Sequence, residues 1–239
     1  LIVSSVQTIT VQLFASMTAS IGNYVATNDS KEVKKIFDIY SFAIFLVYGF
    51  CSVCLFNLSN RFILLLWGKN YLIDEITLFV IIINFFMYGF QTAINVFRDT
   101  TGLFVQGKYR AIFSAFVNVL FSILLVKPLG LCGVILATVI SRVFVSAWYD
   151  PYILYKNFFK SSVKNYYYKF LVYFCWFLIV ALVAKKITDF IDVSVLGFVL
   201  CVFITVLIGF VLVVPFLWTG EWRGLFSYFK SFIQRRKKQ

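Results

Sequence analysis

Seven apolar runs, most of them about 20 residues long, constrain this chain more than any other feature. A helix rises about 1.5 Å per residue, so about 20 apolar residues cross the hydrocarbon core of a bilayer. The runs are too long for the strands of a membrane barrel and lack their apolar–polar alternation. We therefore predict an all-α, polytopic membrane helical bundle of about seven transmembrane helices. The predicted spans are Leu1–Val25, Ile39–Leu58, Ile76–Phe97, Ala111–Val126, Leu129–Tyr149, Phe170–Ala184 and Val193–Phe216.

The composition excludes a water-soluble globular fold. Of the 239 residues, 62% are hydrophobic and 13% are charged. Soluble domains are about half apolar and about a quarter charged. A chain with this excess would expose apolar surface on every side, and only lipid tolerates such a surface.

The basic residues are divided unequally between alternate loops. Most of the 22 lysines and arginines fall in Ala26–Asp38, Arg98–Arg110, Asp150–Lys169 and the tail from Trp218. Cytoplasmic loops of membrane proteins carry such an excess, so we predict a multi-pass protein with a cytoplasmic C-terminus. The net charge of +12 then reflects topology, and no nucleic-acid partner is expected. The opposite loops hold only Arg61, Lys69, Lys127, Lys185 and Lys186.

Polar side chains recur on one face of four predicted helices. At about 100° per residue, positions four or seven residues apart share a face. Such stripes usually face protein or water inside a bilayer. One interpretation is a set of interhelical hydrogen bonds with no cavity; four striped helices favour a polar cavity between them. The stripes are Ser5, Gln12, Ser16 and Asn23; Asn84, Gln91, Asn95 and Arg98; Ser114, Asn118 and Ser122; and Thr138, Arg142 and Ser146.

Arg142 is the most informative single residue. It lies about seven residues, hence about 10 Å, before the cytoplasmic end of its predicted helix. An arginine can extend to the interface over that distance, which is one interpretation. In the other, its guanidinium lies in the cavity and attracts a phosphate-bearing headgroup. No carboxylate lies in the core of a predicted helix to neutralise it, and this favours an anionic ligand from outside the chain.

No pattern indicates an enzyme, a metal site or a cofactor. Histidine is absent, and so is the G-x-x-x-x-G-K-[ST] phosphate loop. The acidic residues, Asp99 and Asp150 among them, fall in predicted loops without the pairing that acid–base chemistry requires. We expect Asp99 to form a local ion pair with Arg98. The C-x-x-C of Cys51 and Cys54 lies in an apolar run, where free thiols pack as small hydrophobes.

The two ends of the chain carry further predictions. Leu1 lies inside an apolar run and is not methionine, so we expect a preceding part of the protein. Within residues 218–239, Trp222, Phe226 and Phe229 recur at helical spacing before a run of basic residues. This pattern predicts an amphipathic, basic cytoplasmic tail that rests on anionic lipid.

One long stretch resembles a known family of transporters. It reads FRDTTGLFVQGKYRAIFSAFVNVLFSILLVKPLGLCGVILATVISR, then YDPYILYKNFF, and it is preceded by SMTASIGNYVA and FILLLWGKNYLI. These segments are similar to the bacterial Wzx-type flippases of polysaccharide repeat units, within the multidrug/oligosaccharidyl-lipid/polysaccharide exporter superfamily. The resemblance covers nearly all of residues 1–159, and the last two helices resemble the family's appended pair in composition only. Two residues depart from the family: Ala111 stands where proline is common, and Ala137 where glycine is common.

The resemblance implies half of a two-lobed, V-shaped transporter that works by alternating access. It implies an incomplete C-terminal transport lobe of five helices (1–149), two appended helices with a basic cytoplasmic loop (150–217), and the tail (218–239). The implied substrate is an undecaprenyl-diphosphate-linked oligosaccharide, moved across the bacterial plasma membrane for capsule, O-antigen or exopolysaccharide assembly. The implied partners are the N-terminal lobe, membrane lipids and a polysaccharide polymerase. Residues expected to line the path, by helical spacing, are Arg142, Arg98, Gln91, Asn95, Asn118, Gln12 and Asn23.

Alternatives remain open at this point. A multidrug exporter shares the fold, so fold alone does not separate the two. The GLF…GKYR loop and the extra helix pair favour the glycan branch. A membrane-embedded glycan polymerase or ligase would carry a sizeable outer loop with catalytic residues, and the sequence has none. A structural membrane subunit would not need the polar stripes.

Overall fold

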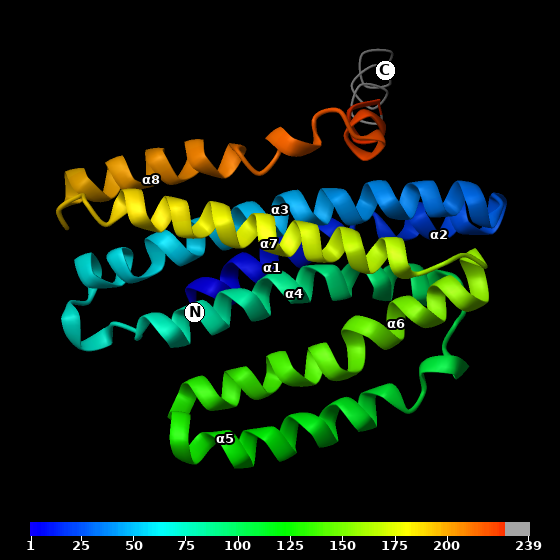
Figure 1. Cartoon of the computed structure of the whole chain (residues 1–239), viewed down its shortest axis with the longest axis horizontal. Coiled ribbons are helices and arrows are strands. Elements are labelled where there is room, and N and C mark those ends of the chain that lie inside the picture. The colour runs from blue at the N-terminus through cyan, green and yellow to red at the C-terminus, as the bar shows by residue number, and fades with distance from the viewer. Residues whose placement is uncertain (228–239) are drawn as a thin grey trace.

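The computed structural model describes residues 1–227, and that part is helical with no strand (Figure 1). The prediction of an all-α fold is confirmed. Asp29, Asp74 and Ser194 each cap a helix by accepting a hydrogen bond, at 2.9 Å, from the backbone N–H three residues later. The α-helices are α1 (Ile2–Ala15), α2 (Thr18–Thr27), α3 (Ser30–Leu66), α4 (Glu75–Thr100), α5 (Arg110–Ser141), α6 (Ala147–Leu154), α7 (Lys164–Thr188) and α8 (Val195–Phe210).

Six helical segments of the described chain are long and apolar enough to cross a membrane. The fourth is a 55-residue run, Val105–Phe159, that contains α5 and α6. This run reverses direction at Gly130, whose φ of 55° and ψ of −131° are not helical. Two antiparallel arms result (Figure 1), so the prediction of about seven transmembrane helices is confirmed.

The reversal within α5 follows from two residues. Pro128 lacks an N–H group and disfavours a regular helix around it. Gly130 adopts a positive φ without a Cβ clash. The two arms then pack together, and the hydroxyl oxygens of Ser114 and Ser141 lie 2.8 Å apart across them.

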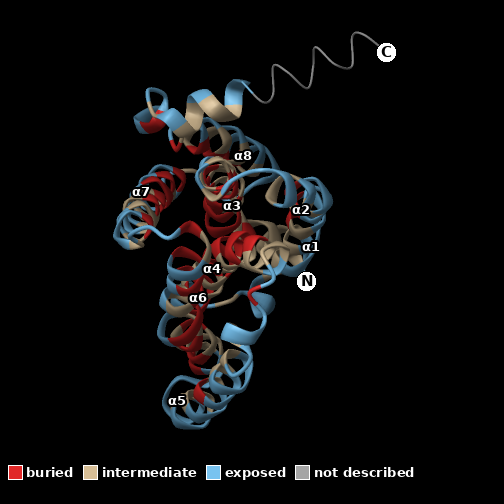
Figure 2. Cartoon of the chain, turned by 90° about the vertical axis from the view of Figure 1, so that its right-hand side faces the viewer, coloured by how far each residue is buried: buried red, intermediate tan, exposed pale blue. Residues whose placement is uncertain are grey.

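Helix α3 is the centre of the bundle and carries much of its aromatic core. It contacts α1, α4, α7 and α8, and the side chains of Phe37, Phe42, Phe45 and Tyr48 are fully buried. Phe45 stacks on Tyr173 of α7 with ring centroids 4.3 Å apart. Such pairs contribute about 0.5–1.5 kcal/mol beyond their burial. By contrast, much of α5 is exposed (Figure 2), as a surface facing lipid or another layer of helices would be.

The predicted basic loops gather at one end of the bundle, where α2 and α4 end and α7 begins (right in Figure 1). We call this the basic end. The predicted loop Ala26–Asp38 is wrong except at Asn28 and Asp29, because α2 continues to Thr27 and α3 already begins at Ser30. Hydropathy missed these first turns because they are charged. They are helical because pairs such as Lys34–Asp38 lie at helical spacing and stabilise them.

The segment after α8 packs on the basic end. Residues 220–227 are helical, and Lys169 Nζ lies 2.6 Å from Glu221 Oε1 and 3.6 Å from Asp38 Oδ2. These ion pairs join α7, α3 and the start of the predicted tail. The remainder of that tail, residues 228–239, lies outside the described residues.

Candidate functional site

Arg142 lies at the junction of α5 and α6 and is held by one face of α4. The junction is a π-helical turn, Arg142–Ser146, a feature frequent at functional sites. Arg142 Nε donates to Asn84 Oδ1 at 2.8 Å, and its Nη1 donates to Gln91 Oε1. Its Cζ lies 5.1 Å from the centre of the Tyr88 ring. These partners are all neutral, so they fix the guanidinium without cancelling its charge.

An open groove of about 490 Å³ borders Arg142 between the α5 hairpin and α4. Small-molecule sites typically measure roughly 300–1,000 Å³. Asn118 Nδ2 donates to Thr138 Oγ1 at 3.1 Å, so hydroxyl and amide groups line the wall formed by the hairpin. The groove is therefore polar although it lies in a membrane-spanning segment. Its lining residues are Gln91, Arg110, Ala111, Ser114, Ala115, Asn118, Thr138, Ser141, Arg142 and Ser146.

Asp150 pairs with two arginines at the basic end of this groove. Only 1% of its side chain is exposed, and its carboxylate lies 2.5 Å from Arg110 Nη1 and 3.5 Å from Arg98 Nη1. A buried carboxylate needs such partners, and these two join α6 to α4 and α5. Arg98 also pairs with Asp99 at 3.0 Å, so the predicted local ion pair is confirmed.

The prediction that Asp150 lies in a loop is wrong. Asp150 is in α6, which continues through Pro151. The proline lies inside this helix, shortly after the π-helical turn Arg142–Ser146. The predicted loop Asp150–Lys169 therefore shortens to residues 160–163, between a second π-helical turn, Tyr155–Phe159, and α7.

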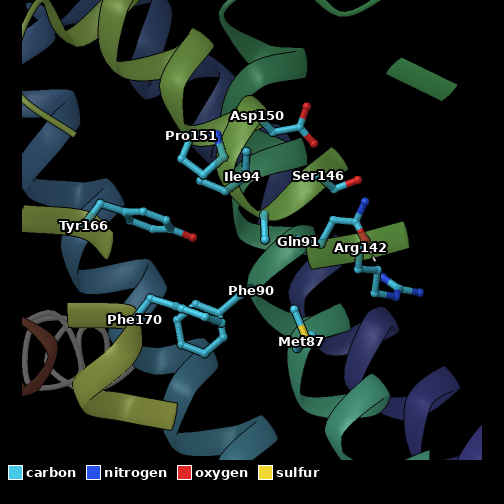
Figure 3. Close-up of a pocket in the computed structure, with 11 residues that line it drawn as sticks. Met87, Phe90, Gln91, Ile94, Arg142, Ser146, Asp150, Pro151, Tyr166 and Phe170 are labelled. Carbon is cyan, nitrogen blue, oxygen red and sulfur yellow. Dashed lines mark hydrogen bonds between the residues drawn. The ribbon is translucent and has the colours of Figure 1, made fainter. Parts of the chain in front are cut away.

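A second, much smaller cavity lies on the other side of Arg142. It measures about 30 Å³, room for about two water molecules. In Figure 3, Gln91 and Arg142 lie at one side of this cavity, and Tyr166 and Phe170 of α7 enter from the other. A phosphate headgroup does not fit in this volume, so the open groove is the space available to a ligand.

The structure brings four of the predicted path residues to the groove. Gln91, Asn118 and Arg142 line it directly. Arg98 stands at its basic end, linked through Asp150 to the groove residue Arg110. Two of the four, Arg142 and Gln91, are hydrogen-bonded to each other.

The other three predicted residues lie elsewhere. Asn95 is partly buried, and its Oδ1 has no hydrogen-bond partner within residues 1–227. Gln12 and Asn23 are exposed on α1 and α2 and line neither cavity. Their place on a transport path stays a prediction.

Sequence reasoning missed Arg110 and Asp150. The sequence predicts a loop that ends at Arg110, but this residue is the first of α5. Asp150 follows Arg142 by eight residues, or about two helical turns. That spacing is consistent with a helix that continues to Asp150. The Asp-Pro pair, however, is typical of a helix end and favours a loop.

The side chains of this site are of the kinds that can bind an anion. Arginine forms bidentate hydrogen bonds with phosphate, and the surrounding amides and hydroxyls supply further hydrogen bonds. No group of three His, Cys, Asp or Glu side chains in the described part of the chain is arranged to hold a metal ion. No protein-family model, curated protein or solved structure matches this chain. Its function is therefore inferred from the groove.

Proposed function

We propose that this chain is part of a flippase that moves undecaprenyl-diphosphate-linked oligosaccharides across the bacterial plasma membrane. The observation that carries the proposal is the environment of the Arg142 guanidinium. It is partly buried in a membrane-spanning segment, and none of the described carboxylates pairs with it. A charge in hydrocarbon is costly, and such residues usually mark a substrate or ion pathway.

The charge of the groove suits a diphosphate. Three guanidiniums, those of Arg98, Arg110 and Arg142, lie along it, against the carboxylates of Asp99 and Asp150. The balance is positive, and it is concentrated at Arg142, which has neutral partners. Coulombic attraction is several times stronger near a protein surface of reduced dielectric than in water. A phosphate headgroup would therefore be drawn toward Arg142, while its apolar tail stayed in the bilayer.

The open side of the groove supports a two-lobed arrangement. The groove is bounded by α4 and the α5 hairpin, so a facing lobe would complete the polar path. Rocking of two lobes around a central site is the usual route to alternating access. In this proposal the basic end faces the cytoplasm, in keeping with the positive-inside rule, and loading takes place from that side.

The test uses the bacterium that carries the gene. Lipid-linked oligosaccharides are extracted after gene deletion, and their leaflet is assigned by access to an external glycan-modifying enzyme. Complete repeat units accumulating on the cytoplasmic side, with loss of surface polysaccharide, are expected. Unpolymerised units in the outer leaflet would instead identify a polymerase or ligase. Normal glycan with altered drug sensitivity would identify a multidrug exporter.

Complementation of the deletion strain tests the groove itself. Arg142→Ala is expected to reduce transport without changing membrane insertion, because it removes the headgroup's main cationic partner. Arg142→Lys keeps the charge but loses the bidentate geometry, so its effect should be intermediate. The matched control is Lys127→Ala, an exposed cation near the α5 reversal. Normal transport by a correctly inserted Arg142→Ala protein would refute this role.

A further inference from the structure

The short connection between α6 and α7 forms a cationic pocket that is separate from the groove. Its volume is about 560 Å³. Lys156, Lys160 and Lys164 recur here at intervals of four residues and are all exposed. The hydroxyl groups of two serines lie among them. The complete lining is Tyr152, Tyr155, Lys156, Lys160, Ser161, Ser162, Val163 and Lys164.

The charge of this pocket is not neutralised by the described part of the protein. No carboxylate lines the pocket, and Lys156, Lys160 and Lys164 form no ion pair within residues 1–227. Lys169, five residues after Lys164, differs sharply because it pairs with two carboxylates. Lys156 instead lies over the Tyr152 ring, with Nζ 5.4 Å from the ring centre. The pocket therefore presents a concentrated positive charge to an external anion.

The backbone turns sharply at the centre of the pocket. The π-helical turn Tyr155–Phe159 ends at Lys160, which adopts a left-handed conformation with φ 49° and ψ 42°. Ser161 N donates back to Tyr155 O at 3.3 Å. The chain therefore reverses direction within a few residues, and the exposed residues on both sides of the turn line the same pocket.

We propose that this pocket binds the phosphate group of an anionic membrane phospholipid. The pocket connects two membrane-spanning segments, Val105–Phe159 and Lys164–Thr188, so it lies at the depth of lipid headgroups. Tyr152 and Tyr168 are exposed nearby, as aromatic residues at a membrane–water interface are. The serine hydroxyls would donate hydrogen bonds to the phosphate oxygens. This site is independent of the flippase proposal and of the headgroup path through the groove.

Lipid binding by purified protein in neutral detergent tests the proposal. Native mass spectrometry gives the apparent Kd for phosphatidylglycerol and, in parallel, for phosphatidylcholine. The pocket variant combines Lys156→Gln, Lys160→Gln and Lys164→Gln. The matched control removes the same charge at the opposite end of the bundle. It combines Lys69→Gln, Lys127→Gln and Lys186→Gln.

We expect phosphatidylglycerol to bind wild type and the control at least about tenfold more tightly than the pocket variant. Each basic residue near an anionic lipid surface contributes roughly a factor of five. Phosphatidylcholine should not distinguish the three proteins. Equal affinity of all three for phosphatidylglycerol would overturn the proposal. Inorganic phosphate that binds wild type as tightly as phosphatidylglycerol does would also overturn it, and would assign the pocket to a soluble phosphate ligand.

A single substitution keeps the proposal testable if the triple variant misfolds. Lys160→Gly removes one charge at a position whose left-handed backbone suits glycine. It should therefore fold at least as well as wild type and bind phosphatidylglycerol about fivefold more weakly. Unchanged binding by this folded variant, together with unchanged binding by any soluble triple variant, would refute the lipid site.

Discussion

Asp150→Asn removes one negative charge from the cluster that joins α4, α5 and α6. In the native protein the carboxylate is 1% exposed, and the side chains of Arg98 and Arg110 are 12% and 16% exposed. Asparagine has nearly the same shape and its oxygen still accepts a hydrogen bond. The substitution therefore tests charge compensation with little change in packing.

The size of the loss in stability depends on which carboxylate each arginine still contacts. Breaking a buried ion pair by removing one partner costs about 3–5 kcal/mol, because the other charge stays buried. Arg98 keeps Asp99 at 3.0 Å, whereas Arg110 keeps no carboxylate among those described. We therefore expect a loss at the lower end of the range, about 3 kcal/mol. In a chain of this size, each kcal/mol lowers Tm by about 2–4 °C, so Tm should fall by about 6–12 °C.

Thermal unfolding of detergent-solubilised protein, followed by circular dichroism, measures this effect. The control is Asp99→Asn, which removes a carboxylate that is 48% exposed and pairs with the same Arg98. Exposed ion pairs contribute only about 0–1 kcal/mol, so the control should lose at most about 4 °C. Adding Arg110→Gln to Asp150→Asn should restore part of the loss, because it removes the uncompensated charge. Equal Tm values for the two single variants would refute the reasoning.

Three further substitutions are expected to change stability in defined ways. Gly89→Ala should lower stability by about 1–3 kcal/mol, because the new methyl group would overlap the Tyr48 ring; a Tm equal to wild type would contradict this close helix contact. Gly130→Ala should cost about 1–3 kcal/mol, because its positive φ strains any residue with a Cβ, and an unchanged Tm would show that the reversal needs no glycine. Partial burial, the largest single influence, raises the pKa of Glu221, but the hydrogen bond and positive charge of Lys169, together with hydrogen bonds from the Glu221 backbone and Thr219, outweigh it, and the net pKa is below the usual value. Its stabilising effect should therefore be full at neutral pH and disappear as pH falls through that lowered pKa, so Glu221→Gln and wild type should differ in Tm at pH 7 and converge in acid.

The fold class could be predicted from the sequence because a helix that crosses lipid requires a long apolar run. Apolar runs of sufficient length correspond to the spans, and the break between the fourth and fifth runs falls at the Pro128–Gly130 reversal. Boundaries were less predictable where charged residues are helical. The sequence predicts loops at the charged start of α3 and at Asp150 of α6, and both segments are helical. Hydropathy detects the lipid-facing length of a helix, whereas capping and ion pairs extend helices beyond it.

The candidate site was predictable only in part, for a related reason. Helical spacing correctly placed Gln91 and Arg142 on polar stripes, and the structure brings these stripes into contact. Spacing within one helix does not reveal which neighbour a stripe faces. The exposed position of Gln12 therefore could not be foreseen, nor could the meeting of Arg110 with Asp150 from segments 40 residues apart.

The three arginines near the groove are compensated in two different ways, and this difference separates structure from function. Arg98 and Arg110 share the carboxylate of Asp150. Their charges therefore form ion pairs that hold helices together at the basic end. Arg142 is held by an amide, a second amide and an aromatic face, so its position is fixed while its charge remains available. Because a carboxylate beside Arg142 would compete with any anionic ligand, neutral partners are what a binding cation in a membrane requires. Substitutions at Asp150 should therefore act mainly on stability, and substitutions at Arg142 mainly on the transport that we propose.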